Sequence, residues 1–426
     1  MLDDKATARS TIVDIPVDVP KQYLPEGLPD GITLLSPDKL DHRTDAEIAA
    51  WLQKRHPVTS EKNIWGFWHN GFANMKPWTQ RNVINWVRRL GPEWNVHIVD
   101  RLDGSETNVL NYVEESYFPK TFLEGTMDGH KAHMGDLVRL PLLWKYGGVW
   151  MDVGLILLRH VDDICWKRIE DPESPYELSA VALMHLPGTY TPLNGFLGTK
   201  SGNPFIKRWH DVYLALWEDG VTNATGFHKH PLLRHLPLFK PDMSTVNLED
   251  DVNFDPEFFS DYVAHYLCGE RIRKLVDPND GFNGPEWYDK HMLIFDAADE
   301  MLYAQIITKW DVEKQFRLLS LKRSGEGAVV NEEWHEAEEF VNTLLAKTAM
   351  LKFPHGPGGE GLKVKMLADL WDADENRDKD HEEGTFAAYL RYGSVHFDQT
   401  REVKKLEWQN PKEETFTVGY LEPVQQ

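Results

Sequence analysis

One stretch, residues 130–163, constrains the fold of this chain most strongly, because it joins a helical pattern to an apolar strand through two glycines. Apolar residues recur at helical spacing from residue 132 to 146. Gly147 and Gly148 then offer the left-handed conformation in which helices commonly end. The pattern predicts a helix that stops in a sharp turn.

Two apolar segments follow the turn. The side chains of residues 149–152 should alternate between two faces, as in a strand, and the apolar run at residues 155–158 is typical of a second buried strand. Asp152 therefore sits at or near the end of a strand. In open α/β sheets, ligands bind beyond the carboxyl ends of the strands.

The predicted helix carries two charges and a proline. Asp136 and Arg139 are three residues apart, so they can either pair with each other or both point at a ligand. A pair at the surface would contribute only about 0.3–0.5 kcal/mol, which does not justify two charges in an otherwise apolar helix. The composition favours contact with a ligand. Pro141 should bend this helix, because it removes a backbone donor.

Strand and helix patterns alternate in the residues before this stretch and continue after it. Strands are predicted at residues 63–69, 94–99, 177–185 and 195–200, and helices at residues 77–90, 106–115 and 203–218. This order predicts an α/β fold with a mostly parallel sheet and helices on both faces. The sheet is expected to end near residue 218. The following half should be mostly helical, with helices at residues 332–350 and 385–392.

Composition narrows the class of protein. The chain has 426 residues, of which 41% are hydrophobic and 16 are tryptophan, so it should fold into a globule. A net charge of −22 weighs against a nucleic-acid partner, because such a surface needs basic residues. An acidic protein that handles phosphates would be expected to recruit a cation.

Cys165 and Cys268 are expected to be free buried thiols, although one bridge between them remains possible. We find no signal peptide and no apolar stretch long enough for a transmembrane helix, so a cytoplasmic location is expected.

Three segments, in this order and spacing, resemble the nucleotide-sugar transferases of glycosyltransferase family 32 and the related capsular polysaccharide synthesis proteins: IWGFWHNG, GDLVRLPLLWKYGGVWMD and NGFLGTKSGNPF. The resemblance covers about residues 61–215 and continues more weakly to about 395. It implies a fold of the GT-A type and transfer of a sugar from a nucleoside diphosphate, generally with retention of anomeric configuration. The donor would be a UDP-sugar or a GDP-sugar.

The resemblance also implies roles for single residues. Asp152 would belong to a D-x-D motif that binds Mn²⁺ or Mg²⁺ on the diphosphate, and Asp136 and Arg139 would lie against the donor. The second aspartate of that motif is missing, because Gly154 stands in its place. Metal binding could rest on Asp152 and water, with help from other groups, or the enzyme could depend on metal only weakly. Those other groups are Asp162, Asp163 and His355.

Further donor-binding residues follow from the same likeness. Trp68 matches an aromatic ring that stacks on the nucleotide base, with Trp65 as the competing choice and core packing as the alternative for both. Asn194 and Gly195 resemble a stretch near the sugar pocket. His355, in a glycine-rich loop at residues 353–361, could close over the diphosphate. The turn at Gly147 and Gly148 completes the predicted donor-binding set.

We divide the chain into an N-terminal arm (1–60), a nucleotide-sugar-binding core (61–220), a lid or acceptor-binding insertion (221–330) and a C-terminal helical region with a tail (331–426). The predicted function is a glycosyltransferase acting on a small molecule, a glycan or a protein. Two alternatives stay open. One is a catalytically inactive relative that binds nucleotide sugars or glycans, and the other is a metal-dependent glycosidase or phosphatase.

Overall fold

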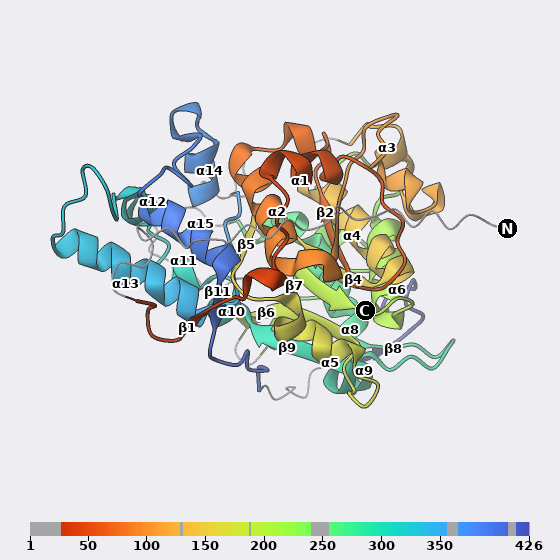
Figure 1. Ribbon diagram of the computed structural model, residues 1–426. Coiled ribbons are helices and arrows are strands. Elements are labelled where there is room, and N and C mark those ends of the chain that lie inside the picture. The colour runs from red at the N-terminus through yellow and green to blue at the C-terminus, as the bar shows by residue number, and fades with distance from the viewer. Residues whose placement is uncertain are drawn as a thin grey trace.

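A mixed sheet forms the centre of the computed structural model, which describes residues 27–127, 131–186, 189–239, 255–355, 365–407 and 415–425 (Figure 1). Within these ranges the sheet has six strands in the order β3-β2-β4-β7-β6-β9. Strand β7 alone runs antiparallel to its neighbours, so the predicted mostly parallel sheet is confirmed. The strands are β2 (Asn63–Phe67), β3 (Asn95–Val99), β4 (Gly148–Met151), β6 (Leu178–Leu186), β7 (Thr189–Thr199) and β9 (Met292–Asp296).

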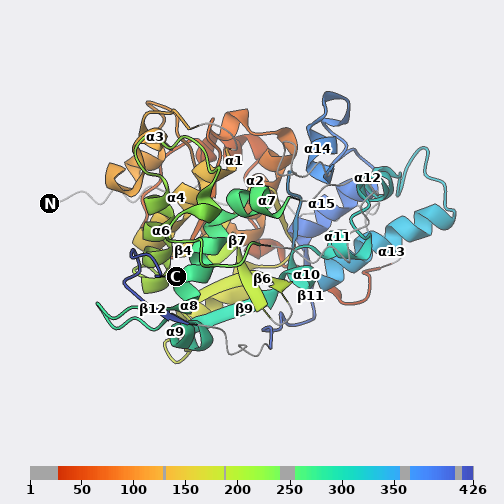
Figure 2. The same ribbon diagram turned by 180° about the vertical axis from the view of Figure 1, so that it is seen from behind.

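Helices cover both faces of this sheet, as Figures 1 and 2 show from opposite sides. Side chains that alternate along each strand divide between two cores: Val149 and Met151 pack toward one layer, and Trp150 packs toward the other. The first layer contains α1 (Asp45–Leu52), α2 (Pro77–Leu90) and α5 (Lys167–Glu170). The second contains α4 (Ala132–Tyr146), α6 (Pro204–Leu216) and α8 (Ala264–Lys274).

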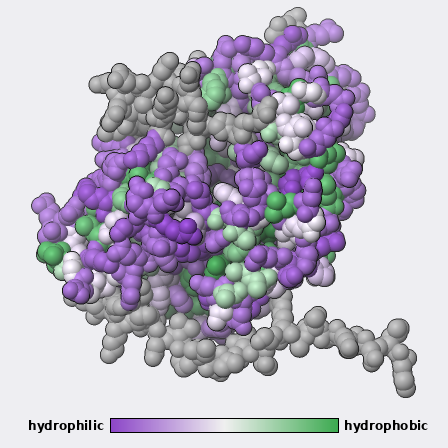
Figure 3. Space-filling model, turned by 90° about the horizontal axis from the view of Figure 1, so that it is seen from above, coloured by the Kyte–Doolittle hydropathy of each residue, from purple (hydrophilic) through white to green (hydrophobic). Residues whose placement is uncertain are grey.

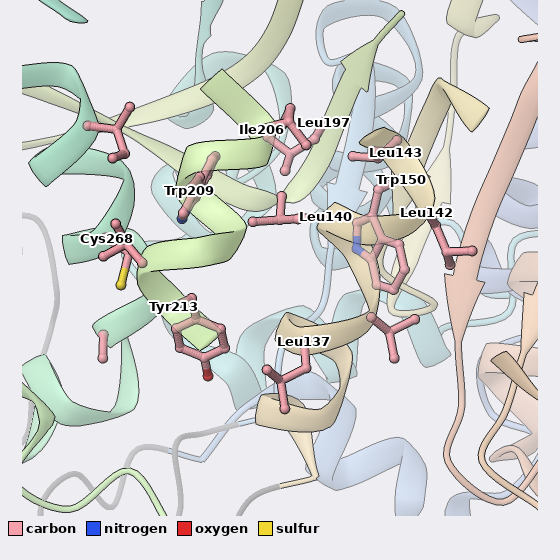
Figure 4. Packing of buried hydrophobic residues seen from close by; sticks show 14 of the residues in the cluster. Leu137, Leu140, Leu142, Leu143, Trp150, Leu197, Ile206, Trp209, Tyr213 and Cys268 are labelled. Carbon is pink, nitrogen blue, oxygen red and sulfur yellow. The ribbon is translucent and has the colours of Figure 1, made fainter. Parts of the chain in front are cut away.

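Helix α4 has the bounds that its apolar spacing predicts, and Pro141 lies inside it. Leu137 and Leu140 pack against α6, whose Trp209 and Tyr213 in turn face α8 (Figure 4). The bend expected at Pro141 stays a prediction. Burial of α4 on the sheet fixes the direction in which its charged residues point.

A third core joins the C-terminal half to the sheet. Its helices are α12 (Val312–Ser320), α13 (Glu332–Lys347), α14 (Leu367–Asp372) and α15 (Phe386–His396), which lie together on one side of the molecule (Figure 1). Strand β10 (Met350–Lys352) pairs antiparallel with β5 (Leu155–Leu157), and β1 (Ile32–Leu34) pairs with β11 (Phe397–Gln399). These pairs bring segments that are far apart in the sequence side by side.

Short elements complete the described part of the chain. They are α3 (Lys120–Leu123), α7 (Pro256–Tyr262), α9 (Gly284–His291), α10 (Ala297–Glu300), α11 (Tyr303–Ile307), β8 (Leu275–Val276) and β12 (Phe416–Thr417). No helix in the described ranges is both long and apolar enough to cross a membrane. The face shown in Figure 3 is mostly hydrophilic. Cys165 and Cys268 are free and buried, as predicted.

Two sequence predictions about the fold are wrong. The α-helix predicted at residues 106–115 is replaced by turns and a short 3-10 helix at Val109–Asn111, because the Asp100 carboxylate accepts hydrogen bonds from the hydroxyls of Ser105 and Thr107, each at 2.7 Å. Such side-chain bonds compete with helix formation. The sheet does not end near residue 218, since β9 extends its far edge. The buried strand predicted at residues 155–158 is confirmed as β5, which pairs with β10 and lies outside the six-stranded sheet.

Candidate functional site

A cavity of about 420 Å³ lies at the carboxyl ends of β2 and β4. This is the edge at which ligands bind to parallel sheets, and the volume suits a small ligand. The lining residues come from the ends of β2 and β4, from α2, α4 and α7, and from β10 with the residues after it. They are Phe67, Trp68, His69, Thr79, Lys131, Ala132, Gly135, Arg139, Trp150, Asp152, Val153, Gly154, Tyr262, Lys352, Phe353, Pro354 and His355.

Asp152 follows the last residue of β4, as the sequence predicts, and its carboxylate faces the cavity. Its backbone N–H donates to the carbonyl of Gly195 at 2.9 Å, which holds the strand end in place. One carboxylate oxygen accepts from the indole N–H of Trp150 at 2.8 Å, and the other pairs with the Lys352 ammonium at 2.5 Å. Burial acts to raise the pKa of Asp152, but the charges of Lys352 and then Arg139 outweigh it and hold that pKa below its usual value. Asp152 is therefore ionised at neutral pH.

Lys352 is a site residue that the sequence analysis missed. It lies opposite Leu155 in the β10–β5 pair, 200 positions from Asp152 along the chain. Its backbone N–H donates to the carbonyl of Met301 at 3.0 Å, and its carbonyl accepts from the side-chain amide of Gln305 at 2.6 Å. These bonds fix the backbone on both sides of the strand. The ammonium is thus aimed into the cavity by a rigid element.

Arg139 also reaches the cavity, from α4. Its guanidinium donates to the carbonyl of Asn194 at 2.5 Å, forms an ion pair with Asp136 at 2.9 Å and lies 4.9 Å from the centre of the Trp150 ring. A second, longer ion pair joins it to Asp152 at 3.7 Å. The predicted helix-face pair therefore exists, and it is buried.

Asp136 lies behind Arg139 and does not line the cavity. Burial acts to raise the pKa of Asp136, but the nearby Arg139 and the hydrogen bond with His133 lower it well below its usual range. The side-chain amide of Asn194 donates to its carboxylate at 2.8 Å. Asp136 thus positions Arg139 and Asn194, while Arg139 is the member of the pair that a ligand can touch.

A buried histidine, also missed in the sequence, completes this support. Burial lowers the pKa of His265 to about 3, so its ring is neutral at physiological pH. The ring nitrogen Nδ1 lies 3.0 Å from the Asn194 amide nitrogen and accepts its second proton. Asn194 is therefore held between Asp136 and His265 beneath the cavity, where the sequence predicted contact with the donor.

Gly195 lies directly under the Asp152–Lys352 pair. A Cβ atom built at this position would be 2.6 Å from the Lys352 ammonium nitrogen and 3.0 Å from a carboxylate oxygen of Asp152. Any side chain here would force the pair to move. The sequence analysis predicted that Gly195 lies near the sugar pocket. In the structure, its lack of a side chain leaves room for the Lys352 ammonium and the Asp152 carboxylate to pair.

The two candidate tryptophans lie in different surroundings. Trp68 lines the cavity, and its indole N–H donates to the carbonyl of Asn74 at 3.1 Å. Trp65 is fully buried, stacks on His97 with ring centres 4.5 Å apart, and donates to the carbonyl of Gly147 at 2.9 Å. Of the two, Trp68 is available to a ligand and Trp65 belongs to the core.

The twin glycines shape the turn before β4 and do not line the cavity. Gly147 ends α4 with φ +64°, and Gly148 follows with φ +102°. A Cβ at Gly148 would lie 2.3 Å from the carbonyl oxygen of Asn63 in the adjacent strand. Their role is close packing between strands, which positions Asp152 indirectly.

His355 lines the cavity at the edge of a described range. Its Nε2 lies 3.0 Å from the Asp372 carboxylate, which also accepts from the indole N–H of Trp78 at 2.8 Å. The rest of the predicted glycine-rich loop, residues 356–361, lies outside the described residues. The prediction that this loop closes over a diphosphate is therefore untested.

Among the described residues, the cavity offers one carboxylate, Asp152, to the divalent cation that the sequence predicts. Asp152 is the only carboxylate among the described residues that line the cavity, and both its oxygens already have N–H partners. Asp162 accepts from Trp94, and Asp163 pairs with Lys167, so neither faces the cavity. Within the described ranges, no three His, Cys, Asp or Glu side chains gather where they could hold a metal. Mg²⁺ is usually held by one or two carboxylates together with waters and substrate phosphates, so a cation here would share Asp152 with Lys352 and Trp150.

This chain is similar to one protein family and to several named glycosyltransferases. The family model of the capsular polysaccharide synthesis protein matches residues 37–238. The chain is 58% identical to the O-glycosyltransferase braB of Annulohypoxylon truncatum over 93% of this chain and 94% of that protein. It is 42% identical to the glycosyltransferase afumC of Aspergillus fumigatus over 85% and 92% of the two chains. It is 39% identical to the O-glycosyltransferase PaGT of Phomopsis amygdali over 95% and 98%.

Proposed function

This chain belongs to the glycosyltransferases related to the capsular polysaccharide synthesis proteins, and we propose that it transfers a sugar from a nucleoside diphosphate sugar to an oxygen atom of its acceptor. The cavity around Asp152 is the proposed site. A UDP-sugar is the first candidate donor and a GDP-sugar the second. Two of the relatives are named O-glycosyltransferases, which supports an oxygen acceptor.

The observation that carries the proposal is the pair of fixed cations at the carboxyl ends of β2 and β4. Lys352 and Arg139 both line the cavity. The Arg139 guanidinium donates to the carbonyl of Asn194, and the Lys352 ammonium donates to the Asp152 carboxylate. A diphosphate placed between them would meet two charge-assisted donors, which are the stronger class of hydrogen bond. The sheet edge and this charge arrangement support a fold of the GT-A type.

The nucleoside end of the donor would lie toward Trp68. This ring lines the same cavity as the two cations and keeps part of its surface exposed. Stacking of a base on an aromatic ring contributes about 1–3 kcal/mol and tolerates different bases. Base, diphosphate and sugar would then be arranged along one side of the cavity, with the acceptor opposite.

In the proposed reaction, the bond between the anomeric carbon and the phosphate oxygen breaks, and its electron pair leaves with the diphosphate. The acceptor hydroxyl forms the new bond to that carbon and gives its proton to the departing phosphate oxygen. Asp152 is the single cavity-lining carboxylate in the described ranges, so a pair of carboxylates for double displacement is not at hand. We therefore propose a same-face displacement with retention of configuration.

Ligand-induced stabilisation tests the donor class. We expect UDP or GDP at 100 times its dissociation constant to stabilise the folded chain by about 2.7 kcal/mol, which appears as a rise in melting temperature. ATP and the free sugar serve as controls. If neither nucleoside diphosphate raises the melting temperature, the chain does not use this donor class.

Turnover tests catalysis separately from binding. Release of nucleoside diphosphate from a nucleotide sugar should fall strongly in an Asp152→Asn variant, because the carboxylate that orients Lys352 and Trp150 is lost. A chain that binds the nucleotide but releases none with any sugar would be an inactive relative. The anomeric configuration of the product, read by NMR, distinguishes retention from inversion.

A further inference from the structure

We infer that the ammonium of Lys352, together with the guanidinium of Arg139, provides the positive charge for the donor diphosphate in place of a divalent cation. This inference rests on the proposed function, because it assigns a role within the nucleotide-sugar site. It makes a distinct statement, namely that nucleotide binding needs no added metal. The observation behind it is the 2.5 Å ion pair between Lys352 and Asp152.

The position of the missing second aspartate is filled from the other half of the chain. Gly154 accepts a hydrogen bond from the backbone N–H of Phe353 at 3.1 Å. A Cβ at Gly154 would lie only 3.0 Å from the carbonyl oxygen of Phe353. The backbone of Phe353, the residue after Lys352, therefore leaves little room for a side chain at position 154. Two adjacent residues thus act on the motif: Phe353 packs against Gly154, and Lys352 pairs with Asp152.

The backbone and side chain of Lys352 are both held in place by neighbouring residues. Lys352 ends β10, whose register with β5 places it opposite Leu155. Its backbone is bonded to Met301 on one side and to Gln305 on the other. Its side chain is only 18% exposed. A lysine held in this way loses little additional freedom when a phosphate binds, which favours its use as a fixed electrostatic group.

The charges also balance as they would around a metal. One divalent cation with two carboxylates sums to zero, and so do the two cations Lys352 and Arg139 with the carboxylates Asp152 and Asp136. Lys131 lines the cavity and adds a further positive charge. With Lys131 counted, these five side chains sum to +1, so the incoming diphosphate meets a positively charged site.

Binding of UDP and GDP to the full-length chain, measured by isothermal titration calorimetry, tests the inference. One series contains EDTA and the other contains Mn²⁺. We expect the dissociation constant of the wild-type chain to differ by less than about twofold between the two, since the protein supplies the charge itself. Binding that appears only with Mn²⁺ overturns the inference but leaves the proposed function intact. If neither nucleotide binds in either series, the proposed function fails, and the inference fails with it.

Variants of the lysine add a second arm. We expect Lys352→Met to weaken binding in EDTA by roughly tenfold or more, because a hydrogen bond to a charged group is lost. Lys352→Arg keeps the charge and should retain more affinity than the methionine variant. Lys365→Met, at an exposed lysine that pairs with Glu313, is the matched control and should bind as the wild type does. Equal affinity of the wild type and Lys352→Met in EDTA would overturn the inference.

Discussion

Replacing Gly195 with alanine tests how closely the reaction depends on the position of the Lys352 ammonium. The new Cβ would lie 2.6 Å from that nitrogen and 3.0 Å from the Asp152 carboxylate. Gly195 is not in the left-handed region of backbone conformation, so alanine can adopt the same backbone. The ammonium is the end of a flexible side chain and must move by about 1 Å to reach an ordinary contact distance.

The expected effect is large on activity and small on stability. A displacement of about 1 Å in a positioned group can reduce the rate by about 100-fold, which corresponds to about 2.7 kcal/mol in the activation barrier. Alanine is more favourable than glycine inside a strand by about 0.5–1 kcal/mol, which offsets part of the local repacking. The melting temperature should therefore change little while kcat/KM falls.

The measurement is kcat/KM for release of nucleoside diphosphate from the donor, together with a thermal unfolding curve. Gly198→Ala is the matched control, because it makes the same change on β7 but its Cβ would meet Cys165 at 3.1 Å, away from the cavity. We expect this control to lose stability and to keep kcat/KM. A Gly195→Ala enzyme with wild-type kcat/KM would refute the claim that the placement of Lys352 matters.

Three further changes test other parts of the structure. Asp136→Asn removes the nearer of the two carboxylates that pair with the buried Arg139, so the free energy of unfolding in urea should fall by about 3 kcal/mol. Trp68→Leu should raise the dissociation constant of the nucleoside diphosphate by about 5- to 150-fold in calorimetry, as loss of base stacking predicts. Burial acts to raise the pKa of Asp380, but Arg391 and a second arginine keep it below its usual value. Its contribution to stability is therefore present above about pH 4 and lost as pH falls through the lowered pKa, and Asp380→Asn should flatten that decline in urea unfolding.

Each of these expectations has an outcome that contradicts it. An Asp136→Asn chain as stable as the wild type would show that Arg139 does not need its partner. Trp144→Leu, on α4 and outside the cavity, should leave nucleotide affinity unchanged, and equal losses at Trp68 and Trp144 would argue against stacking. For Asp380→Asn, an acid limb that coincides with that of the wild type would exclude this carboxylate as its source.

Local patterns in the sequence were enough to predict the elements that carry Asp152. The bounds of α4, the turn at Gly147 and the strand end before Asp152 all depend on residues close together in the chain. Apolar spacing and glycine conformation act over a few residues, so they can be recognised without the fold. The same holds for Trp68, which follows β2 directly.

Predictions failed where side-chain hydrogen bonds competed with a helix, or where a strand pairs with a segment far away in the sequence. Residues 106–115 have helical spacing, but the hydrogen bonds to Asp100 hold the chain in turns. Strand β9 reaches the sheet edge only after more than 70 residues of helices and loops that follow β7. Nothing near β9 in the sequence indicates which edge it will join. Long-range pairing of this kind depends on tertiary packing, which strand propensity does not report.

Lys352 could not have been identified from its own surroundings, because a lysine at the end of a short strand is an ordinary surface residue in most proteins. Only the register of β10 with β5 aims it at Asp152. Gly154 stands where the D-x-D motif has its second aspartate. Considered alone, this glycine indicates a loss of metal binding. The backbone of Phe353, directly after β10, explains that glycine, since a Cβ atom there would lie only 3.0 Å from its carbonyl oxygen. The C-terminal half is therefore part of the site, because its backbone crowds position 154 and its Lys352 brings a positive charge to Asp152.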